Sequence, residues 1–346
     1  MRTSLLFPTS RRGWFWLAMR MLFLIVLPLG LTLWYMIDVP GHSYRGPVAP
    51  LTAQERALAG RLHSHVTAIA SEEHNALHPE ALARAADYLA AQLGDMAYTV
   101  GVQNFDGGDG PVRNLAVEIK GATAPEQIVI VGAHYDSASG APGANDNGSG
   151  TAMVLELARA FSKSAPQKTL RFVLFANEEP PYFGQNTMGS LVYARRSRQR
   201  QENIIAMLSL ETVGYFSDEA GSQKYPGIFK PFFPGEGNFI AFIGDLKSRD
   251  LLHRSLTRFR SVQNFPSEGI AAFPKIKGID WSDHSAFWAN DYRALMVTDT
   301  AIFRYPHYHT RQDTPDKLRY DRMARLFSGV HAVVADLAGA PPLAAP

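Results

Sequence analysis

Beyond residue 98, short apolar runs alternate with amphipathic stretches, and this pattern leaves few folds open to the chain. The apolar runs are rich in β-branched residues and have the length of single strands, whereas the amphipathic stretches have the helical period. Two strands come first and strand-helix-strand units follow. That order predicts an α/β fold, specifically a three-layer sandwich with a central mixed, mostly parallel sheet. The expected strands are 98–105, 112–119, 127–132, 170–176, 204–210 and 294–298.

Helical patterns surround these strands. Thr52 and Glu55 have the spacing of a capping box, which predicts a helix over 52–70. Segment 215–237 is rich in Gly, Pro and Phe and is interpreted as an insertion or long loop. Residues 52–340 are therefore expected to form one domain. Further helices are expected at 79–93, at 149–161, from Asn238 onward and at 320–337.

Composition excludes several classes of function. The chain of 346 residues contains no cysteine, which excludes disulfides, thiolate metal sites and cysteine nucleophiles. Any metal must therefore be bound by histidine and carboxylate. The net charge is +2, but the first twenty residues contain four arginines and no acid, so the remainder carries a net charge of −2. A slightly acidic body offers no basic footprint for phosphate backbones, so nucleic acid is not an expected partner.

An apolar stretch at 14–37 contains a single charged residue, Arg20. At about 1.5 Å per residue it covers roughly 36 Å as a helix, enough for a hydrocarbon layer of ~30 Å. Aromatic residues near both ends, Trp14 and Trp34 among them, suit the membrane interfaces. We therefore expect one transmembrane helix at 14–37 and a single-pass protein of the cell membrane.

A cleaved signal peptide is the alternative, because it also begins with positive charge followed by an apolar run. The run is long for a signal peptide, and the residues after it lack a small-residue cleavage site. Arginines before the helix place tail 1–13 in the cytoplasm and the body in the periplasm or the extracellular space. Segment 38–51 contains three prolines and two glycines and is expected to be a linker.

Polar residues follow the expected strands at the point where each strand ends. In an open α/β sheet these ends share one rim, where several buried carboxylates would repel one another unless a cation joined them. Taken alone, each residue also has an ordinary structural interpretation, as a hydrogen-bonded histidine, a solvated glutamate or a turn residue. The residues at the strand and loop ends are His134, Asp136, Asp146, Glu178, Glu179 and Glu211.

Four motifs in this order resemble those of the di-zinc aminopeptidase family, whose relatives include glutamate carboxypeptidases and glutaminyl cyclases. The resemblance spans about residues 55–340 and implies a metal-dependent, zinc-exopeptidase-like protein with two zinc ions per chain. Mn²⁺ or Co²⁺ could occupy similar ligand sets. The motifs are His134-x-Asp136, Asp146 in Ala-Asn-Asp-Asn-Gly-Ser-Gly, Glu178-Glu179 and His309-Thr-x-x-Asp313-Thr314.

The resemblance implies a metal role for five residues. Asp146 would bridge both ions, with His134 and Glu211 completing one site and Glu179 and His309 the other. Imidazole and carboxylate ligands agree with the chemistry of zinc, and a bridging carboxylate suits a pair of ions. Glu211 stands where the family usually has aspartate, and we expect it to bind metal because the carboxylate is kept.

Two further residues would act in catalysis. Glu178 would be the general base, which takes a proton from a water between the metals and returns it to the leaving amine. Asp136 would accept the second N–H of His134 and so fix the tautomer that binds metal. The family often has a non-proline cis peptide bond directly after the bridging aspartate.

The substrate would be bound by residues outside the ligand set. Tyr182 and Phe183 lie in a stretch after Glu179 that is longer than in compact members, and we expect them to line the substrate pocket. His309 is preferred to His307 as the ligand because it directly precedes the Thr-x-x-Asp-Thr run, which leaves His307 as a neighbour or substrate contact.

Asp283 and His284 lie in Trp-Ser-Asp-His-Ser-Ala-Phe, which resembles a family motif that lines the site without binding metal. Two interpretations remain open for this motif. Either residue could orient the substrate, or Ser282 or Asp283 could cap a helix.

The leading hypothesis is a membrane-anchored metallo-exopeptidase, most specifically an aminopeptidase that hydrolyses N-terminal peptide bonds. Its partners would be a peptide substrate and, through the N-terminal helix, the membrane; the sequence identifies no protein partner. The alternatives are glutaminyl cyclase-type acyl transfer on the same fold and a non-catalytic binding ectodomain, because a fold does not fix a function. A metal-to-protein ratio near two would favour the peptidase over the single-zinc cyclase.

Overall fold

The computed structural model describes residues 8–341 and divides into two units, the second of which begins at Val39. In the first unit, one helix runs over Arg11–Ile37. It consists of α1 (Arg11–Met21), the π-helical turn η1 (Leu22–Val26) and α2 (Leu27–Ile37). This helix is long and apolar enough to cross a membrane, a property that a signal sequence shares. Residues 1–7 of the predicted tail lie outside the described residues.

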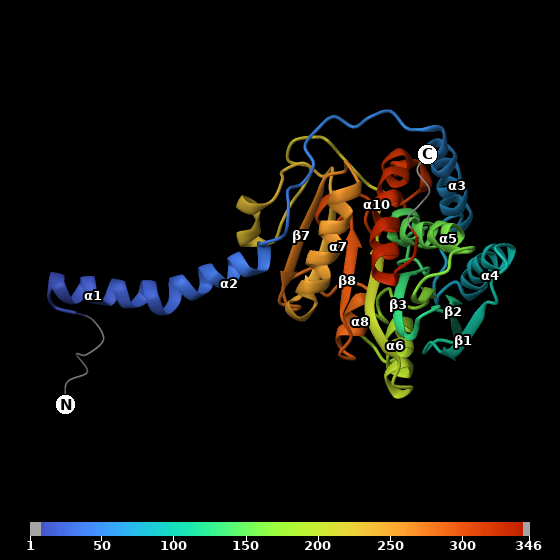
Figure 1. The fold of residues 1–346 in the computed structure, drawn as a ribbon, viewed down its shortest axis with the longest axis horizontal. Helices are drawn as coiled ribbons and strands as arrows, with labels where there is room; N and C mark the ends of the chain where they lie inside the picture. The colour runs from blue at the N-terminus through green and yellow to red at the C-terminus, as the bar shows by residue number, and fades with distance from the viewer. Residues whose placement is uncertain (1–7, 342–346) are drawn as a thin grey trace. The chain divides into compact units, whose positions relative to one another are not determined.

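The second unit, the body, is an α/β fold built on one sheet of eight strands (Figure 1). β3 pairs in parallel with β4 and β5, and β8 continues the parallel run beside β5. The pairs β1–β2, β2–β4 and β6–β8 are antiparallel, whereas β6 and β7 are parallel. The predicted mixed, mostly parallel sheet is therefore confirmed. In spatial order the strands are β1 (Gly101–Asp106), β2 (Pro111–Ile119), β4 (Lys168–Phe175), β3 (Ala124–His134), β5 (Asn203–Glu211), β8 (Ala294–Thr298), β6 (Ile240–Asp245) and β7 (Ser267–Ala272).

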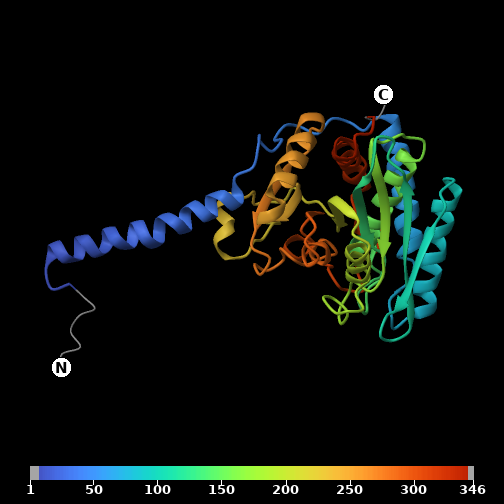
Figure 2. The same ribbon diagram turned by 60° about the horizontal axis from the view of Figure 1, so that its bottom comes forward.

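Helices cover both faces of this sheet, which confirms the three-layer sandwich (Figure 2). Side chains of a strand point alternately to its two faces, so Val129 and Val131 of β3 belong to one core, and Ile128 and Ile130 to the other. The smaller core is covered by α6 (Gly189–Gln199) and α8 (His284–Trp288). The larger core is covered by α3 (Ala53–Ile69), α4 (Pro79–Asp95), α5 (Gly150–Phe161), α7 (Arg249–Val262) and α10 (Tyr320–Ala338).

The capping box predicted at the start of α3 is present. The hydroxyl of Thr52 accepts from the amide of Glu55 at 3.1 Å, and the Glu55 carboxylate accepts from the amide of Thr52 at 2.7 Å. The helix predicted from Asn238 is wrong, because Ile240 begins the strand β6 and the next α-helix, α7, starts only at Arg249. All six residues of β6 are buried, and a short apolar run has no period that separates a buried strand from a buried helix.

Short elements complete the body. The segment predicted as an insertion, 215–237, contains the 3-10 helix η3 (Gly227–Phe232) and a bridge between Ala220 and Glu236. Its side chains share a cavity with β6 and β7, so it covers that end of the sheet. The remaining short helices are the π-type turn η2 (Ala144–Ser149), η4 (Leu246–Ser248), α9 (Ala301–Arg304) and η5 (Pro315–Lys317).

Candidate metal centre

The centre lies at the carboxyl ends of β3, β4 and β5, which are parallel neighbours. His134 ends β3 and Glu211 ends β5, while Glu178 and Glu179 follow β4 after a two-residue turn. Because the carboxyl ends of parallel strands meet at one edge of a sheet, residues far apart in the sequence come together there. Two more residues complete the centre from η2 and from the loop after α9, namely Asp146 and His309.

Asp146 lies between two pairs of ligand atoms, one pair facing each of its carboxylate oxygens. Its Oδ1 is 3.3 Å from Nε2 of His134, and the same nitrogen is 3.3 Å from Oε2 of Glu211. Its Oδ2 is 2.9 Å from Nε2 of His309, and that nitrogen is 3.2 Å from Oε2 of Glu179. Each oxygen of Asp146 therefore faces one histidine–glutamate pair, which is the arrangement expected of a bridging carboxylate.

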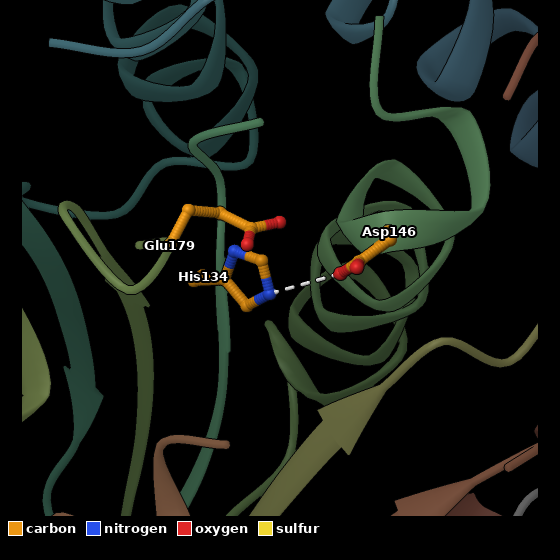
Figure 3. Close-up of side chains that lie close together, drawn as sticks. All are labelled: His134, Asp146 and Glu179. Atoms are coloured by element: carbon orange, nitrogen blue, oxygen red, sulfur yellow. Dashed lines mark ion pairs between the residues drawn. The ribbon is translucent and has the colours of Figure 1, made fainter. Parts of the chain in front are cut away.

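Three of these side chains form a compact set. Ligand atoms of His134, Asp146 and Glu179 all lie within 4.8 Å of one another. Figure 3 shows the three side chains converging from β3, from the turn before α5 and from the loop after β4. The sequence-based expectation that these three residues share one centre agrees with this geometry.

The donor atoms fit a bound cation. His134 is fully buried, and within residues 8–341 neither its Nε2 nor Oε1 of the buried Glu179 has a hydrogen-bond partner. Buried polar atoms without a partner are costly and call for an explanation. Two ligands of a tetrahedral zinc ion, each about 2.0–2.1 Å from it, lie about 3.3 Å apart. The separations between Nε2 of His134 and its two carboxylate neighbours have this value.

The electrostatics of the centre show an excess of negative charge. Burial raises the pKa of Glu178 well above its ordinary value, and the nearby charges of Glu211 and Glu179 raise it further. Burial also raises the pKa of Glu179 to about 7 and that of Glu211 to about 8, with a contribution from the charge of Asp146 in both cases. For His309, burial lowers the pKa, but Asp146 and Glu179 more than offset it and bring it to about 11. The glutamates of the centre therefore hold protons more tightly than ordinary carboxylates, and a bound cation would compete with those protons.

Asp313 holds the turn that presents Asp146. Its two carboxylate oxygens accept from the amides of Asn145, at 2.8 Å, and of Asp146, at 3.1 Å. The hydroxyl of Tyr305 donates to the same carboxylate at 2.8 Å. One short motif thus contains His309, which the sequence analysis predicts to be a ligand, and Asp313, which holds the turn of the predicted ligand Asp146.

Asp136 supports the centre in a different way from the one expected. Nδ1 of His134 lies 3.1 Å from the carbonyl oxygen of Asp136 and 3.6 Å from its carboxylate, so the backbone fixes the imidazole. The carboxylate instead accepts from the amides of Glu178 and Glu179, each at 3.1 Å. Asp136 thereby positions the turn that carries two carboxylates of the centre.

Glu211 is held by side chains from two other segments. Ser282 donates to its Oε2 at 2.7 Å, and the amide nitrogen of Asn147 does so at 3.3 Å. Asn147 follows Asp146 through a cis peptide bond, the feature often found in the resembling family. The motif that contains Asp283 and His284 thus reaches the centre through its serine.

Three residues at the centre have left-handed backbone conformations that are unusual for non-glycine residues. They are Asn177 beside Glu178, Thr212 beside Glu211, and His309, with φ angles of 59°, 48° and 55°. Such conformations cost on the order of 1–3 kcal/mol each and cluster at functional sites. For the β-branched Thr212 the conformation is particularly rare.

The predicted substrate residues have contacts of their own. Asp283 and His284 are fully buried, and Nε2 of His284 donates to the carbonyl oxygen of Ile279 at 2.7 Å. Asp283 lies close enough to His134 and Glu178 for their charges to interact, so its role toward a substrate stays a prediction. Asp283 is the N-cap residue of α8 but makes no side-chain capping bond. Tyr182 donates to Asp109 at the surface.

Two other predicted residues remain partly exposed without reaching the ligand atoms. Phe183 packs at the edge of the smaller core. His307 contacts Tyr305 edge-on, with 5.5 Å between ring centroids.

Tyr308 belongs to the centre although the sequence analysis does not single it out. Its ring stacks on His309 with 3.9 Å between centroids, and it lines a cavity of about 40 Å³ with Glu211 and Trp281. Burial raises the pKa of Tyr308, and the charges of the surrounding carboxylates raise it further, so the phenol stays protonated. Its position directly before the predicted ligand His309 is the only signal for it in the sequence.

Several known proteins resemble this chain in sequence. Residues 114–334 match the sequence profile of Peptidase family M28. The chain is 36% identical to the Escherichia coli protein YfbL over 258 residues. The aligned region covers 72% of this chain and 78% of YfbL. It is 26% identical over 272 residues to a Saccharomyces cerevisiae protein named probable aminopeptidase YDR415C, and the aligned region covers 73% of this chain and 66% of that protein. It spans about half the length of fungal relatives named probable zinc metalloprotease.

Solved structures share the fold of the body. The aminopeptidase from Aneurinibacillus sp. strain AM-1 superposes with a TM-score of 0.63 at 18% identity, covering 85% of this chain and 97% of that one. The glutaminyl cyclase of Fimbriiglobus ruber does so with a TM-score of 0.61 at 18% identity, covering 84% and 97%. At these identities the likeness establishes the fold.

Proposed function

Because this chain belongs to Peptidase family M28, we propose that it is a membrane-anchored aminopeptidase in which Asp146 bridges two metal ions and Glu178 is the general base. The observation that supports two ions is the division of the Asp146 carboxylate between two histidine–glutamate pairs. Relatives and fold neighbours named aminopeptidase or zinc metalloprotease support the activity.

One ion would be held by Oδ1 of Asp146 with His134 and Glu211, and the other by Oδ2 of Asp146 with Glu179 and His309. Imidazole and carboxylate donors in these numbers suit zinc. When bound, the ions would act as Lewis acids that polarise the scissile carbonyl and lower the pKa of the attacking water.

Glu178 lies beside the ligands without pairing closely with them. Its Oε2 is 3.8 Å from Nε2 of His134, and the side chain is buried among other carboxylates. A carboxylate in this setting has a high proton affinity, so it takes a proton from the attacking water and delivers it to the leaving amine. The protonated phenol of Tyr308 would donate a hydrogen bond to the oxygen that becomes negative as the carbonyl turns tetrahedral.

The charges of the centre favour the amino end of a peptide. Within residues 8–341, the ion pairs of its carboxylates all involve His134 or His309, and none involves lysine or arginine. A free carboxylate usually needs an arginine or lysine for recognition, whereas an ammonium group suits an acidic site. This charge pattern is why we propose aminopeptidase rather than carboxypeptidase activity.

An apolar cavity beside the centre suggests where the first side chain of the substrate binds. The cavity of about 40 Å³ opens between Glu211 and Tyr308. Its lining includes the aliphatic side chains of Ile243, Met296 and Ile302 and the aromatic rings of Trp281 and Phe303. A small cavity of this composition favours an N-terminal residue with a modest aliphatic side chain.

The test uses aminoacyl 4-nitroanilides with a free or an acetylated amine. We expect the free leucyl substrate to be hydrolysed, the acetylated one to be resistant, and a chelator to abolish turnover. Glu178→Gln should lower kcat by about 10²–10⁴-fold, since a general base contributes this much, while metal content equals that of the wild type. Wild-type turnover by Glu178→Gln would overturn the role of Glu178.

Glutaminyl cyclisation is the second candidate, because a solved cyclase shares the fold. The two activities differ in their products. A cyclase releases ammonia from an N-terminal glutaminyl peptide and leaves every peptide bond intact, whereas an aminopeptidase releases free glutamine. Mass spectrometry of the products therefore separates them.

The anchoring part of the proposal concerns the helix Arg11–Ile37. Arginines at and before its first half suit the cytoplasmic side, which would place the body outside. The intact mass of protein extracted from membranes tests this point. An uncleaved anchor keeps residues 1–37, whereas a signal peptide is missing from the mature chain.

A further inference from the structure

We propose that the body carries a membrane-docking surface, formed by the outer face of η3 and the loop after β7, which rests on the anionic lipid headgroups of the bilayer that holds the N-terminal helix. This inference rests on the anchoring part of the proposed function. The docking surface consists of Ile228, Lys230, Phe232, Phe273, Lys275 and Lys277, all of them exposed.

The helix η3 has apolar side chains on both of its faces. Phe229 is buried and, with Phe233, lines an apolar cavity of about 70 Å³ against β6 and β7. Ile228 and Phe232 line no part of that cavity and are 65% and 48% exposed. The inward pair explains how η3 is fixed to the body, but nothing within the described body covers the outward pair. Adjacent exposed apolar side chains of this kind mark an interaction surface.

The loop after β7 extends the same surface. Phe273 directly follows the strand and is 46% exposed. Ile276 and Lys277 line the cavity that Phe229 also lines, so the loop and η3 are neighbours. The two parts of the surface therefore form one continuous region.

The charges around these apolar side chains suit anionic lipid. Segment 224–233 contains two lysines and no acid, and segment 273–281 contains two lysines and one aspartate. The body as a whole is slightly acidic, so this cationic character is local. Apolar and aromatic side chains ringed by lysine are typical of surfaces that enter the headgroup region of a bilayer.

The connection between the N-terminal helix and the body is short and is attached beside β7. Val39 packs against the larger core, Arg260 donates to the carbonyl oxygen of Pro40 at 2.7 Å, and the amide of Ser267 donates to the hydroxyl of Ser43 at 3.0 Å. The chain is thus attached to the body from Val39 onward, beside the edge strand β7. The helix ends at Ile37, and two residues span at most roughly 8 Å. So short a connection keeps the β7 edge within reach of the bilayer that holds the helix.

Matched control positions lie at the other end of the sheet. Leu77 and Val102 are also exposed apolar residues, at 66% and 50%, and Val102 belongs to β1, the strand farthest from β7 in the sheet order. Exposure alone does not distinguish them from Ile228 and Phe232. The proposal depends on location beside the tether and on the neighbouring lysines.

The experiment exploits the absence of cysteine from the chain. Single-cysteine variants Ile228→Cys, Phe232→Cys, Leu77→Cys and Val102→Cys of the full chain are labelled with an environment-sensitive nitrobenzoxadiazole dye. Each is reconstituted into nanodiscs of phosphatidylcholine with phosphatidylglycerol and a spin-labelled lipid quencher. We expect a blue shift and lipid quenching at residues 228 and 232, solvent-like emission at residues 77 and 102, and weaker quenching when phosphatidylglycerol is left out.

Three outcomes would overturn the proposal. Emission at residues 228 and 232 as solvent-like as at 77 and 102, in protein that co-elutes with the discs, rejects the docking surface and leaves the anchor intact. A blue shift without lipid quenching that grows with protein concentration identifies a second copy or another protein as the occupant. Failure of the full chain to co-elute with the discs rejects the anchor itself, and the docking surface with it.

Discussion

Two clusters that contain buried acids lie close to helix α5, and they differ in which groups supply the positive charge that balances the acids. Glu156 in the middle of α5 is 1% exposed and pairs with Arg61 at 2.8 Å, Arg159 at 3.0 Å and His65 at 3.1 Å. These partners hold the pKa of Glu156 below its ordinary value, although burial alone would raise it. Asp146, just before α5, belongs to a cluster of four carboxylates whose ion pairs involve imidazoles alone.

This difference distinguishes a structural cluster from a metal centre. A buried carboxylate is stable when the chain supplies its counter-charge, as at Glu156. The strand-end carboxylates outnumber their imidazole partners, and a bound cation would neutralise the surplus negative charge without the protons that these carboxylates otherwise take up. Both regions contain buried acids, so burial alone does not separate them. The difference is whether lysine or arginine side chains balance the carboxylates, and that difference points to the metal site.

The largest expected effect comes from removing the carboxylate that is proposed to bridge the metals. Asp146→Asn should reduce activity to background and bring the metal content well below the wild-type value, because this carboxylate faces both ligand pairs. Glu156→Gln is the matched control and should keep both metal and activity. Metal analysis and the leucyl assay check both variants; normal metal content in Asp146→Asn would contradict the bridging role.

Removing the metal should make stability depend on pH with a predictable sign. In the metal-free protein the pKa values of Glu179, Glu211 and His309 are about 7, 8 and 11, all above their ordinary values. The native state then binds more protons than the unfolded state between about pH 5 and 8, so its stability falls as pH rises through that range. The gap in unfolding free energy between metal-bound and metal-free protein should widen from pH 5 to 8. Urea unfolding at several pH values measures it, and a gap that narrows would contradict the account.

A change in the cluster around Glu156 should affect the free energy of unfolding but not activity, and its contribution to stability should fall in acid rather than as pH rises. Glu156→Gln should lower the free energy of unfolding by about 1–3 kcal/mol at neutral pH, because it leaves charged partners without their acid. The folded-state pKa of Glu156 is lowered, so its contribution is fully present above about pH 4.5 and is lost as pH falls through the folded value. The difference between the variant and the wild type should therefore shrink in acid, which chemical denaturation at pH 3 to 7 can test.

The smallest effect concerns support of a single ligand. Ser282→Ala removes the 2.7 Å hydrogen bond to Glu211 and should weaken metal affinity by about 10-fold, at the low end for partners of metal ligands. Ser285→Ala, three residues away in α8, is a matched serine that does not touch the centre. Competition with a chromogenic chelator measures both affinities, and equal values for the two variants would remove Ser282 from the account.

The parts of the fold that depend on local pattern could be predicted from the sequence. Apolar runs followed by an acid or a histidine located β3, β4 and β5 together with His134, Glu178 and Glu211, because strand ends share an edge whatever the details of packing. The strand β6 could not be separated from a helix, since its six residues are buried on both faces and show no period. The sequence pattern also predicts neither β7 nor α6. Ser267–Ala272 lacks β-branched residues apart from Ile270.

Contacts between distant segments could not be predicted. Ser282 reaches Glu211 across 71 positions, and no spacing rule connects them. Tyr308 precedes a ligand, but only the folded loop shows that its ring stacks on His309. Asp283 and His284 were plausible substrate contacts in sequence, and their complete burial depends on packing around α8.

The number of metal ions bound per chain tests the central claim most directly. The full chain, dialysed against metal-free buffer and then against zinc, should bind about two ions per chain by inductively coupled plasma mass spectrometry, one for each histidine–glutamate pair that faces Asp146. A folded chain that binds one ion or fewer would contradict the claim, because the Asp146 carboxylate would then not join two ions.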